Sequence, residues 1–402
     1  MEPIGAHHIS QFILKVASRC NLNCPYCYVY NKGDSTWKIR PPLMSDGVFQ
    51  KILTRIRNHC RNTCQNYANI IFHGGEPCLI GVEQFDAWCD RAAEFLKDTA
   101  RADFSIQTNG TLIDDAWVEV FRKHRVKIGI SMDGPAEIHD ANRPDHAGRG
   151  SYAQVENGIR LLAAKRVPYG ILCVIPLGVD PLLVHGHFMS LGCKQVTYVL
   201  PHYTYDNVEA IRKQYGPTPC ADFLIPVFDE WWFNGTPDIH IGDLRNMARV
   251  VMGGESHIET IGNVAPRYVF IESDGEVEGL DNLRSCSNGI TQIGVNVRNN
   301  EFLDILAAKG IHGRAIFQGM PLCKTCQACP EVETCGGGYL PHRYSRLNGF
   351  DNPSVWCADL LKIFTHIRMR MEVSVEETRE RRLSLRAKDA EAELLQPAGA
   401  AS

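Results

Sequence analysis

The sequence lacks the features that mark several classes of protein. No apolar run reaches the roughly 18 to 20 residues that a membrane span needs, and residues 1–10 lack the basic and apolar parts of a secretory signal. The formal net charge is only -4, which gives no reason to expect nucleic-acid or anionic-membrane binding. With 44% hydrophobic and 22% charged residues, the composition is not that of a disordered chain. We therefore expect a globular cytoplasmic protein with no nucleic-acid and no membrane partner.

Cysteine, in contrast, is abundant, with 16 residues in a chain of 402. The cytoplasm keeps thiols reduced, so this number argues against a disulfide scaffold and for metal ligation or thiol chemistry. The cysteines are therefore the first place to look for function.

Residues 11 to 205 alternate short β-rich segments with longer amphipathic ones, a pattern that predicts a mainly parallel sheet covered by helices. Five or six such units are too few for a closed eight-stranded barrel, but they can form an open, partial one whose chemistry lies at the carboxyl ends of the strands. We expect strands at 12–17, 70–73, 104–108, 127–132, 170–175 and 195–200, and helices at 45–62, 83–96, 114–124 and 151–165.

The alternation fades after residue 205. An apolar helix is expected at 223–232, and a hairpin at 267–271 and 276–280, because Asp274-Gly275 between two extended runs favours a tight turn. From about Met371 the sequence predicts a solvated helix that ends in a flexible tail at 396–402. These features divide the chain into a barrel (1–235), a cysteine-rich domain (236–370) and a helical tail (371–402).

Three cysteines, Cys20, Cys24 and Cys27, follow the first expected strand directly. Thiolates separated by three and then two residues can surround one metal ion or cluster, and three rather than four leave a coordination position for another ligand. A structural zinc site would need a fourth protein ligand, for which His73 is the best candidate.

Small and polar residues follow the next three strands. HGGEP occupies 73–77, QTNG occupies 107–110 and SMDGP occupies 131–135. Each of these segments could be a simple turn, but glycines also let backbone approach a ligand closely, and Glu76 could accept a hydrogen bond from an ammonium group. Together they predict a small-molecule site at the carboxyl edge of the sheet.

The CNLNCPYC segment and these turns resemble the radical S-adenosylmethionine (SAM) superfamily. The resemblance implies an α/β fold with a partial (β/α)6 TIM-like barrel and a [4Fe-4S] cluster on Cys20, Cys24 and Cys27 whose fourth iron binds SAM. It also implies cleavage of SAM to a 5'-deoxyadenosyl radical, which abstracts hydrogen from an unactivated C–H bond. An external one-electron reductant such as flavodoxin or ferredoxin is then a required partner.

The resemblance also suggests residues that contact SAM. The GGE motif would bind the methionine amino group, and in the sulfatase-maturase branch Ser131 and Arg143 would contact the ribose and the carboxylate, with Tyr26 and Leu200 near the adenine. The full set of cofactor-binding candidates is Tyr26, Gly74, Gly75, Glu76, Gln107, Asn109, Ser131, Asp133, Arg143 and Leu200.

A second set of cysteines lies near the carboxyl end of the chain, as Cys326, Cys329, Cys335 and Cys357, preceded by Cys323. Four thiolates can hold zinc or an iron-sulfur cluster, and their spacing alone does not distinguish the two. The region resembles a SPASM domain, which usually carries two auxiliary [4Fe-4S] clusters.

The SPASM pattern is incomplete here. It would place a cysteine at Tyr339 and a pair around the hairpin, where this chain has Leu280. The resemblance therefore implies one auxiliary cluster, on Cys326, Cys329, Cys335 and Cys357, with Cys323 as a reserve ligand.

Three further segments, CYVYNKGDSTW at 27–37, CGGGYLPHRYS at 335–345 and NGFDNPSVWC at 348–357, resemble the FxsB and GrrM type maturases of ribosomal peptides. Our main hypothesis is therefore abstraction of a side-chain Cβ hydrogen in a precursor peptide, followed by an intramolecular C–C bond to an aromatic ring (a cyclophane). Asp281, which aligns roughly with a catalytic aspartate of the sulfatase maturases, is the candidate base, although it could simply cap a turn.

Two alternatives stay open. A sulfatase maturase would oxidise Cys or Ser to formylglycine with the same cofactor, but the missing first auxiliary site and the three segments above count against it. A non-enzymatic zinc-binding scaffold belongs to a different class, and it leaves the GGEP and SMDGP turns unexplained.

Overall fold

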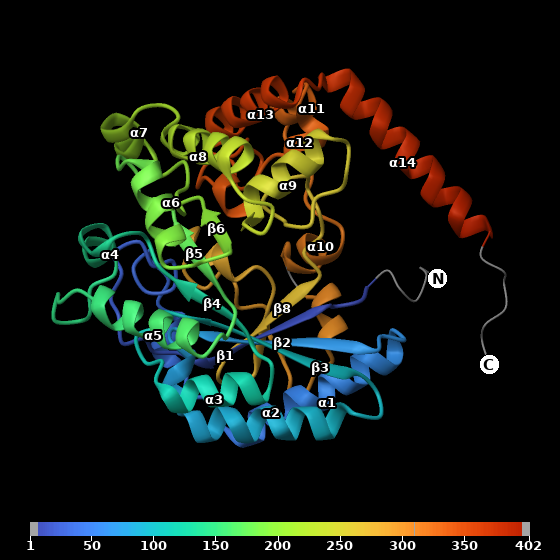
Figure 1. The fold of residues 1–402 in the computed structure, drawn as a ribbon. Coiled ribbons are helices and arrows are strands. Elements are labelled where there is room, and N and C mark those ends of the chain that lie inside the picture. The colour runs from blue at the N-terminus through green and yellow to red at the C-terminus, as the bar shows by residue number, and fades with distance from the viewer. Residues whose placement is uncertain (1–6, 309, 396–402) are drawn as a thin grey trace.

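A computed structural model of the chain describes residues 7–308 and 310–395. One sheet runs through the molecule, with strand order β10-β9-β8-β1-β2-β3-β4-β5-β6-β7. Helices α1, α2 and α3 cover one side of it, and the carboxyl-terminal helices gather above it (Figure 1). The sheet therefore has one helix-covered face and one face that turns inward.

All six expected strands are present, and each pairs in parallel with the next. The expectation of a partial (β/α)6 barrel is therefore confirmed. The strands are β1 Gln11–Ala17, β2 Tyr67–Gly74, β3 Arg101–Thr108, β4 Lys127–Ser131, β5 Tyr169–Val174 and β6 Gln195–Val199.

The helices between these strands form where amphipathic spacing predicts them. Ser45 caps the first one, since its hydroxyl accepts a hydrogen bond from the Val48 N–H at 3.3 Å. The helices of this half are α1 Asp46–Asn62, α2 Val82–Leu96, α3 Asp115–Lys123, α4 Ala136–Asn142, α5 Tyr152–Ala164 and α6 Pro181–Ser190.

The predicted hairpin is also present, as β8 Tyr268–Ile271 and β9 Glu276–Glu278. Strand β8 pairs in parallel with β1, so the hairpin extends the barrel sheet beyond its first strand. The other two strands, β7 His240–Ile241 and β10 Val295–Asn296, have two residues each. The hairpin thus brings residues 272–284 against the strand that precedes the first three cysteines.

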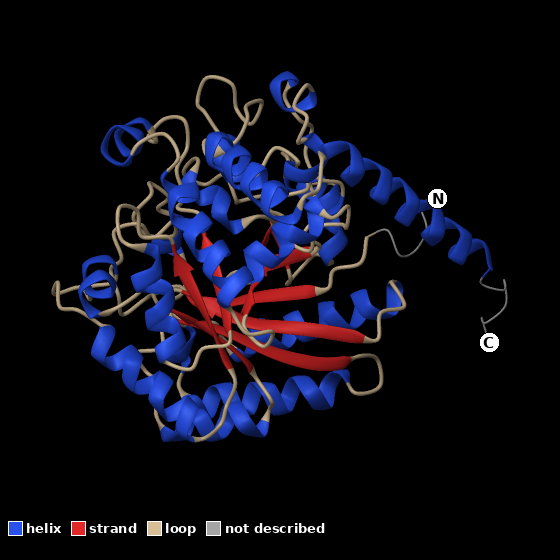
Figure 2. Ribbon diagram, turned by 45° about the horizontal axis from the view of Figure 1, so that its top comes forward, coloured by secondary structure: helices blue, strands red, loops and turns tan. Residues whose placement is uncertain are grey.

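The expected helix at 223–232 begins earlier, because Pro219 starts α8 (Pro219–Asp229), and a π-helical turn, η3 Glu230–Asn234, follows it. Figure 2 shows helices on both sides of the sheet, with one long helix extending away from it toward the carboxyl end of the chain. The remaining helices are α7 Glu209–Tyr215, α9 Gly242–Val251, α10 His312–Phe317, α11 Lys324–Gln327, α12 Val332–Cys335, α13 Cys357–Met371 and α14 Val375–Leu395. Single 3-10 turns occupy η1 Thr36–Ile39, η2 Pro77–Ile80, η4 Asp281–Ser285, η5 Phe302–Leu306 and η6 Leu340–Arg343.

The solvated helix expected after Met371 is α14, whereas the flexible tail expected at 396–402 lies outside the described residues. None of the helices in the described part of the chain combines the length and the apolar character that a membrane crossing requires.

Alternation along the strands determines which side chains reach the barrel interior. Phe12, Leu14 and Val16 of β1 are buried in the main hydrophobic core, so Lys15 faces the opposite side of the sheet. Gln107 on β3 and Ser131 at the end of β4 likewise line the interior. The inner face of the sheet is therefore polar near its carboxyl edge.

Candidate functional site

The first three cysteines lie on the loop that follows β1, and this loop is held against the end of β2. The Gly75 N–H donates to the Ala17 carbonyl at 2.8 Å, and the Glu76 N–H donates to the Arg19 carbonyl at 3.0 Å. A Cβ atom at Gly75 would lie 2.0 Å from the Tyr30 hydroxyl and 2.2 Å from the Arg19 oxygen. Only glycine permits this close approach.

Cys20, Cys24 and Cys27 all line a cavity of about 280 Å³ between this loop and the barrel interior. Burial raises the pKa of Cys20 to about 12 and that of Cys24 to about 11, and it also raises the pKa of Cys27. Three thiolates this deeply buried need positive charge from a metal centre. The donor set therefore fits a bound metal group.

The spacing of the thiols distinguishes one zinc ion from a larger cluster. Within the described ranges 7–308 and 310–395, no three cysteine sulfurs all lie within 4.8 Å of one another. A zinc ion about 2.3 Å from each sulfur would bring the sulfurs to within about 3.8 Å of each other. His73 is not placed as the fourth zinc ligand either, since its Nδ1 accepts a hydrogen bond from the Gly74 N–H at 2.8 Å. The arrangement favours an iron-sulfur cluster over the zinc alternative.

A buried polar group forms the far wall of this cavity. The Tyr26 hydroxyl donates to Asp133 Oδ2 at 2.6 Å, and Arg143 donates to the same carboxylate from Nε at 3.0 Å and Nη2 at 3.1 Å. Tyr26 and Arg143 line the cavity, whereas Asp133 is fully buried behind them. Asp133 thus orients an arginine that keeps further N–H donors for a carboxylate.

Five of the expected strand-end residues line the cavity directly. They are Gly74, Gly75, Gln107, Asn109 and Ser131. Gln107 Nε2 donates to Ser131 Oγ at 2.9 Å, and Asn109 Nδ2 donates to Asn21 Oδ1 at 2.8 Å. These contacts hold amides and a hydroxyl at the cavity surface, where they can bind the polar parts of a nucleoside.

Glu76 and Leu200 are placed differently from the expectation. The Glu76 carboxylate is fully buried behind the wall, where it accepts from the Asn109 N–H at 2.7 Å, the Thr108 hydroxyl at 2.7 Å and the Cys78 N–H at 2.9 Å. It ties the end of β2 to the end of β3, and its contact with an ammonium group stays a prediction. Leu200 lines a neighbouring cavity, and Val199 takes its place at this one.

Asp281, the candidate base, is fully buried next to the cavity but does not line it. It accepts hydrogen bonds from the Tyr28 hydroxyl at 2.7 Å, Lys15 Nζ at 2.5 Å and Arg284 Nε at 2.6 Å. Burial alone would raise the pKa of Asp281, but the charges of Lys15 and Arg284 outweigh it and hold this pKa far below its usual range. The side chain is thus an ionised acceptor joined to the cavity by Tyr28, not a turn cap.

The second set of cysteines also comes together, from α11, α12 and the start of α13. Burial, together with the neighbouring thiols, Cys357 among them, raises the pKa of Cys326 and of Cys335 to about 12. Burial is the main cause that raises the pKa of Cys357, and the neighbouring Cys329 and Cys323 raise it as well. Mutually interacting thiols of this number fit a fully ligated metal centre.

The positions where a SPASM pattern would place the other thiols hold different chemistry. The Tyr268 hydroxyl donates to Glu259 Oε1 at 2.8 Å, and Tyr339 is hydrogen-bonded to Tyr268. Leu280 packs in a small apolar cluster that Tyr268 borders. Among the described residues, this place therefore holds tyrosines, a glutamate and a leucine, and Cys286 is the one thiol that packs beside them.

Sequence reasoning missed several residues of the site. Tyr28, His202 and Asn282 line the cavity beside the three thiols. The sequence does carry a signal for Lys15, because a lysine inside the apolar strand FILKVA is buried and therefore needs a partner of opposite charge. His202 carries no such signal, because a lone histidine after a strand is a common surface residue.

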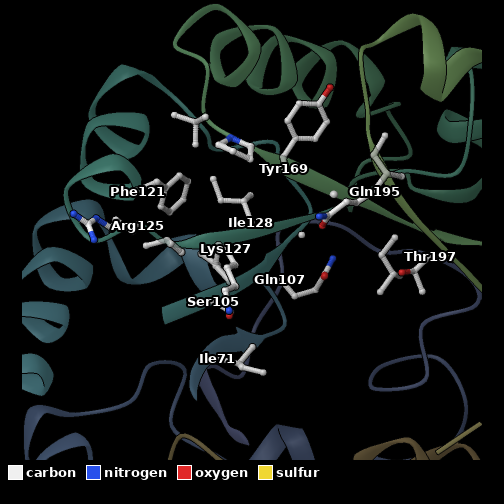
Figure 3. Close-up of a pocket in the computed structure, with 18 of the residues that line it drawn as sticks. Ile71, Ser105, Gln107, Phe121, Arg125, Lys127, Ile128, Tyr169, Gln195 and Thr197 are labelled. Atoms are coloured by element: carbon white, nitrogen blue, oxygen red, sulfur yellow. The ribbon is translucent and has the colours of Figure 1, made fainter. Parts of the chain in front are cut away.

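Another hollow, of about 790 Å³, lies at the opposite end of the barrel. Figure 3 shows its lining side chains, among them Phe121, Arg125, Lys127 and Tyr169, around the amino-terminal ends of the strands. None of the thiols lines it. Gln107 and Leu172 line both hollows, whereas the first three thiols line only the smaller one at the carboxyl end of the strands.

Comparison with known proteins agrees with this arrangement. The model of the radical SAM superfamily matches residues 14–181. The chain is 31% identical to a cysteine-type anaerobic sulfatase-maturating enzyme of Clostridium novyi over 68% of this chain and 73% of that protein. It is 33% identical to an uncharacterised protein of Synechocystis over 85% of this chain and 86% of that protein. The solved structure of anSMEcpe with bound AdoMet is 24% identical, covers 90% of this chain and 97% of its own, and has a TM-score of 0.75; a second one holds AdoMet and the Cp18Cys peptide.

These findings correct the main hypothesis. The characterised relatives that align along most of the chain are sulfatase-maturating enzymes, so the expectation of cyclophane formation is wrong, and the formylglycine alternative agrees better. The chain therefore belongs to the radical SAM enzymes, which bind SAM and a [4Fe-4S] cluster, and within them to the family of peptide and sulfatase maturases.

Proposed function

We propose that this chain oxidises a cysteine or serine side chain of a peptide substrate to formylglycine. The observation that carries the proposal is the Tyr28–Asp281 pair, which supplies an ionised proton acceptor at the wall of the cavity beside Cys20, Cys24 and Cys27. The similarity to the cysteine-type enzyme of Clostridium novyi supports the same reaction.

The residues that would hold the cofactors are those that line or support this cavity. Bound to Cys20, Cys24 and Cys27, the cluster and SAM supply a 5'-deoxyadenosyl radical that removes one hydrogen atom from the substrate Cβ. Arg143 would bind the SAM carboxylate, and Gln107, Asn109 and Ser131 would bind its hydroxyl and amino groups. Gly74 and Gly75 let the cysteine loop lie against the end of β2, Tyr26 would border the nucleoside, and Asp133 and Glu76 position this wall.

The chain's own contribution is to take the proton. After loss of the Cβ hydrogen, the substrate must lose one electron and the proton of its hydroxyl or thiol to become an aldehyde or thioaldehyde. That proton becomes strongly acidic as the electron leaves, so even a weak base accepts it. Asp281 Oδ2 receives it through the Tyr28 hydroxyl, 2.7 Å away. Water then converts the thioaldehyde to formylglycine with release of hydrogen sulfide.

The electron needs an acceptor, and the second set of thiols provides the place for one. We infer one auxiliary [4Fe-4S] cluster on Cys326, Cys329, Cys335 and Cys357, with Cys323 next to Cys326 as a reserve ligand. Tyr339 and Leu280 support this inference, because they occupy positions where a second auxiliary cluster would need cysteine ligands. An external one-electron reductant, such as flavodoxin or ferredoxin, would start each reaction cycle.

The test uses the anaerobically reconstituted full chain with SAM, dithionite and the Cp18Cys peptide, or the same peptide with serine in place of cysteine. We expect 5'-deoxyadenosine and a peptide aldehyde, detected by mass spectrometry after trapping with a hydrazine. The Cys20→Ala variant should form neither product. Formation of 5'-deoxyadenosine that depends on the peptide, without an aldehyde from either peptide, would overturn the proposal.

A further inference from the structure

The proposed reaction sends an electron from the substrate to the auxiliary cysteines, and the route for this electron is the question that the proposed function leaves open. Tyr339 and Leu280 replace thiolate ligands between the two sets of cysteines, so no cluster is expected at this intermediate position. Electron transfer through protein slows steeply with distance. Without a cluster at this position, other groups in close contact must connect the substrate to the auxiliary cysteines.

A second cavity, of about 240 Å³, lies between the barrel and the cysteine-rich domain. It shares Val199, His202 and Asn282 with the SAM-side cavity, so the two meet at one wall. Tyr339 and His342 line its other side. His202 thus stands on the boundary between the reaction space and the cysteine-rich domain.

Aromatic rings lead from His202 to the auxiliary cysteines without a gap. The ring centroids of His202 and His342 are 5.4 Å apart, and those of His342 and Trp356 are 6.5 Å apart. Tyr339 forms a side branch, 6.0 Å from His202 and 5.4 Å from His342. Trp356 directly precedes Cys357 in the chain. Three rings therefore span the distance between the cavity and a cluster ligand.

A hydrogen bond makes the route shorter still. The indole Nε1–H of Trp356 donates to the Pro201 carbonyl at 3.0 Å, and this bond is buried. Pro201 precedes His202, and Trp356 precedes Cys357. The connection from His202 to Cys357 thus consists of covalent bonds interrupted by one hydrogen bond.

Packing alone gives no reason for a histidine at position 342. Its side chain is 2% exposed, and neither ring nitrogen has a hydrogen-bond partner within the described part of the chain. A buried polar group without a partner destabilises the fold, and an apolar ring at this position would avoid that cost. Burial lowers the pKa of His342 well below its usual value, so the ring is neutral.

We propose that His202, His342 and Trp356 form the electron path from the substrate to the auxiliary cluster. This inference rests on the proposed function. One electron leaves the carbon radical of the substrate and arrives on the cluster held by Cys357, while the proton goes to Asp281. The rings shorten the gaps for tunnelling, and none of them is itself oxidised or reduced. The path thus replaces the missing first auxiliary cluster.

The experiment compares Trp356→Leu with Trp356→Phe, which keeps a ring but loses the hydrogen bond to Pro201. Each holoenzyme, given one equivalent of a one-electron reductant for the SAM cluster, is mixed with SAM and the Cp18Cys peptide for a single turnover, freeze-quenched and examined by EPR. In Trp356→Leu we expect an organic radical to persist and the auxiliary cluster to be reduced about tenfold more slowly than in the native chain. In Trp356→Phe, the rate of cluster reduction should lie between that of the native chain and that of Trp356→Leu.

Controls separate this path from a structural defect. Trp88→Leu removes an equally buried tryptophan that stacks on Phe49 and lines neither of the two cavities, and it should leave cluster reduction unchanged. The reduction potential of the auxiliary cluster should be the same in all variants. If Trp356→Leu does not hold its clusters, His342→Leu tests the next ring with the same expected result.

The result that would overturn the path is native-rate reduction of the auxiliary cluster in Trp356→Leu and His342→Leu. It differs from failure of the proposed function, because the native chain would then still give the peptide aldehyde. Conversely, if the native chain gives a different oxidised peptide, the formylglycine proposal fails while the EPR comparison still tests the route.

Discussion

Replacing Lys15 by methionine tests the ion network that holds the candidate base. Lys15 Nζ lies 2.5 Å from Asp281 Oδ1 and 3.1 Å from Glu272 Oε1, and all three side chains are buried. Methionine keeps most of the volume and removes the charge. The substitution therefore tests electrostatics with little change in packing.

The magnitude follows from what remains around the two carboxylates. Removing one partner of a buried ion pair typically costs about 3–5 kcal/mol, because a buried charge loses its counter-ion. Here Arg284 still contacts Asp281 at 2.6 Å and Glu272 at 2.8 Å. We therefore expect the free energy of unfolding to fall by about 3 kcal/mol, at the lower end of that range. The pKa of Asp281 should rise at the same time, since Lys15 is one of the cations that lower it.

Urea unfolding of the anaerobic holoenzyme, followed by circular dichroism, measures this loss. Lys127→Met is the matched control, since Lys127 is an exposed lysine on the parallel strand β4, and should change stability by less than about 0.5 kcal/mol. The double variant Lys15→Met/Asp281→Asn should be more stable than the sum of the single changes predicts, by at least about 1 kcal/mol. An unfolding curve of Lys15→Met that coincides with that of the control would refute the reasoning.

Three other changes have expected outcomes. Burial and the nearby Glu272 charge raise the pKa of Glu278 to about 8, so the folded chain retains a proton that the unfolded chain releases near pH 4.5. Stability should therefore fall as pH rises from about 4.5 to about 8 and level off above that, and Glu278→Gln should flatten a series of melting temperatures across this range. Iron and acid-labile sulfide should be about eight per native chain and about four after replacement of Cys20, Cys24 and Cys27 by alanine, whereas about twelve, or zinc without sulfide, would contradict the cluster assignment. Tyr28→Phe should form 5'-deoxyadenosine at the native rate but yield less aldehyde, as liquid chromatography would show; an unchanged yield would remove Tyr28 from the proton route.

The sequence predicts the barrel well because the barrel is locally encoded. Each βα unit carries its own alternation and amphipathic spacing, and a cap such as Ser45 marks where a helix begins. The two-residue strands β7 and β10 carry no such pattern, since their pairing depends on neighbours far away in the sequence. Helix α8 began before its expected start because Pro219 and the residues after it were not recognised as a first helical turn.

The candidate site likewise has one part that local sequence motifs predict and another part that depends on the fold. The cysteine spacing and the GGE, QTNG and SMDGP turns are local, and the structure places their members at or directly behind one cavity. The environment of Asp281 is not local, because Lys15 is 266 positions away and Tyr28 is 253 positions away. Only a resemblance pointed to Asp281, and only the fold explains how it is held ionised.

The error about the reaction has a physical reason of the same kind. Cyclophane formation and formylglycine formation begin with the same event, removal of a Cβ hydrogen, so the residues that bind the cluster and SAM do not distinguish them. The outcome depends on what surrounds the carbon radical next: a base, an electron route and the space for a second side chain. In the proposed reaction those groups come from residues 28, 202, 281 and 342, which lie in four separate parts of the chain.

The missing auxiliary cysteines then have a different meaning from the one the sequence suggested. They counted against a sulfatase maturase, on the assumption that the electron needs a thiolate-bound cluster at the intermediate position. The structure shows ring contacts of 5.4 Å and 6.5 Å and a 3.0 Å hydrogen bond between His202 and the residue before Cys357. A chain with this connection can lose the intermediate ligands and still move one electron per turnover. Tyr339, which stands at one of those positions, has become part of the same aromatic group.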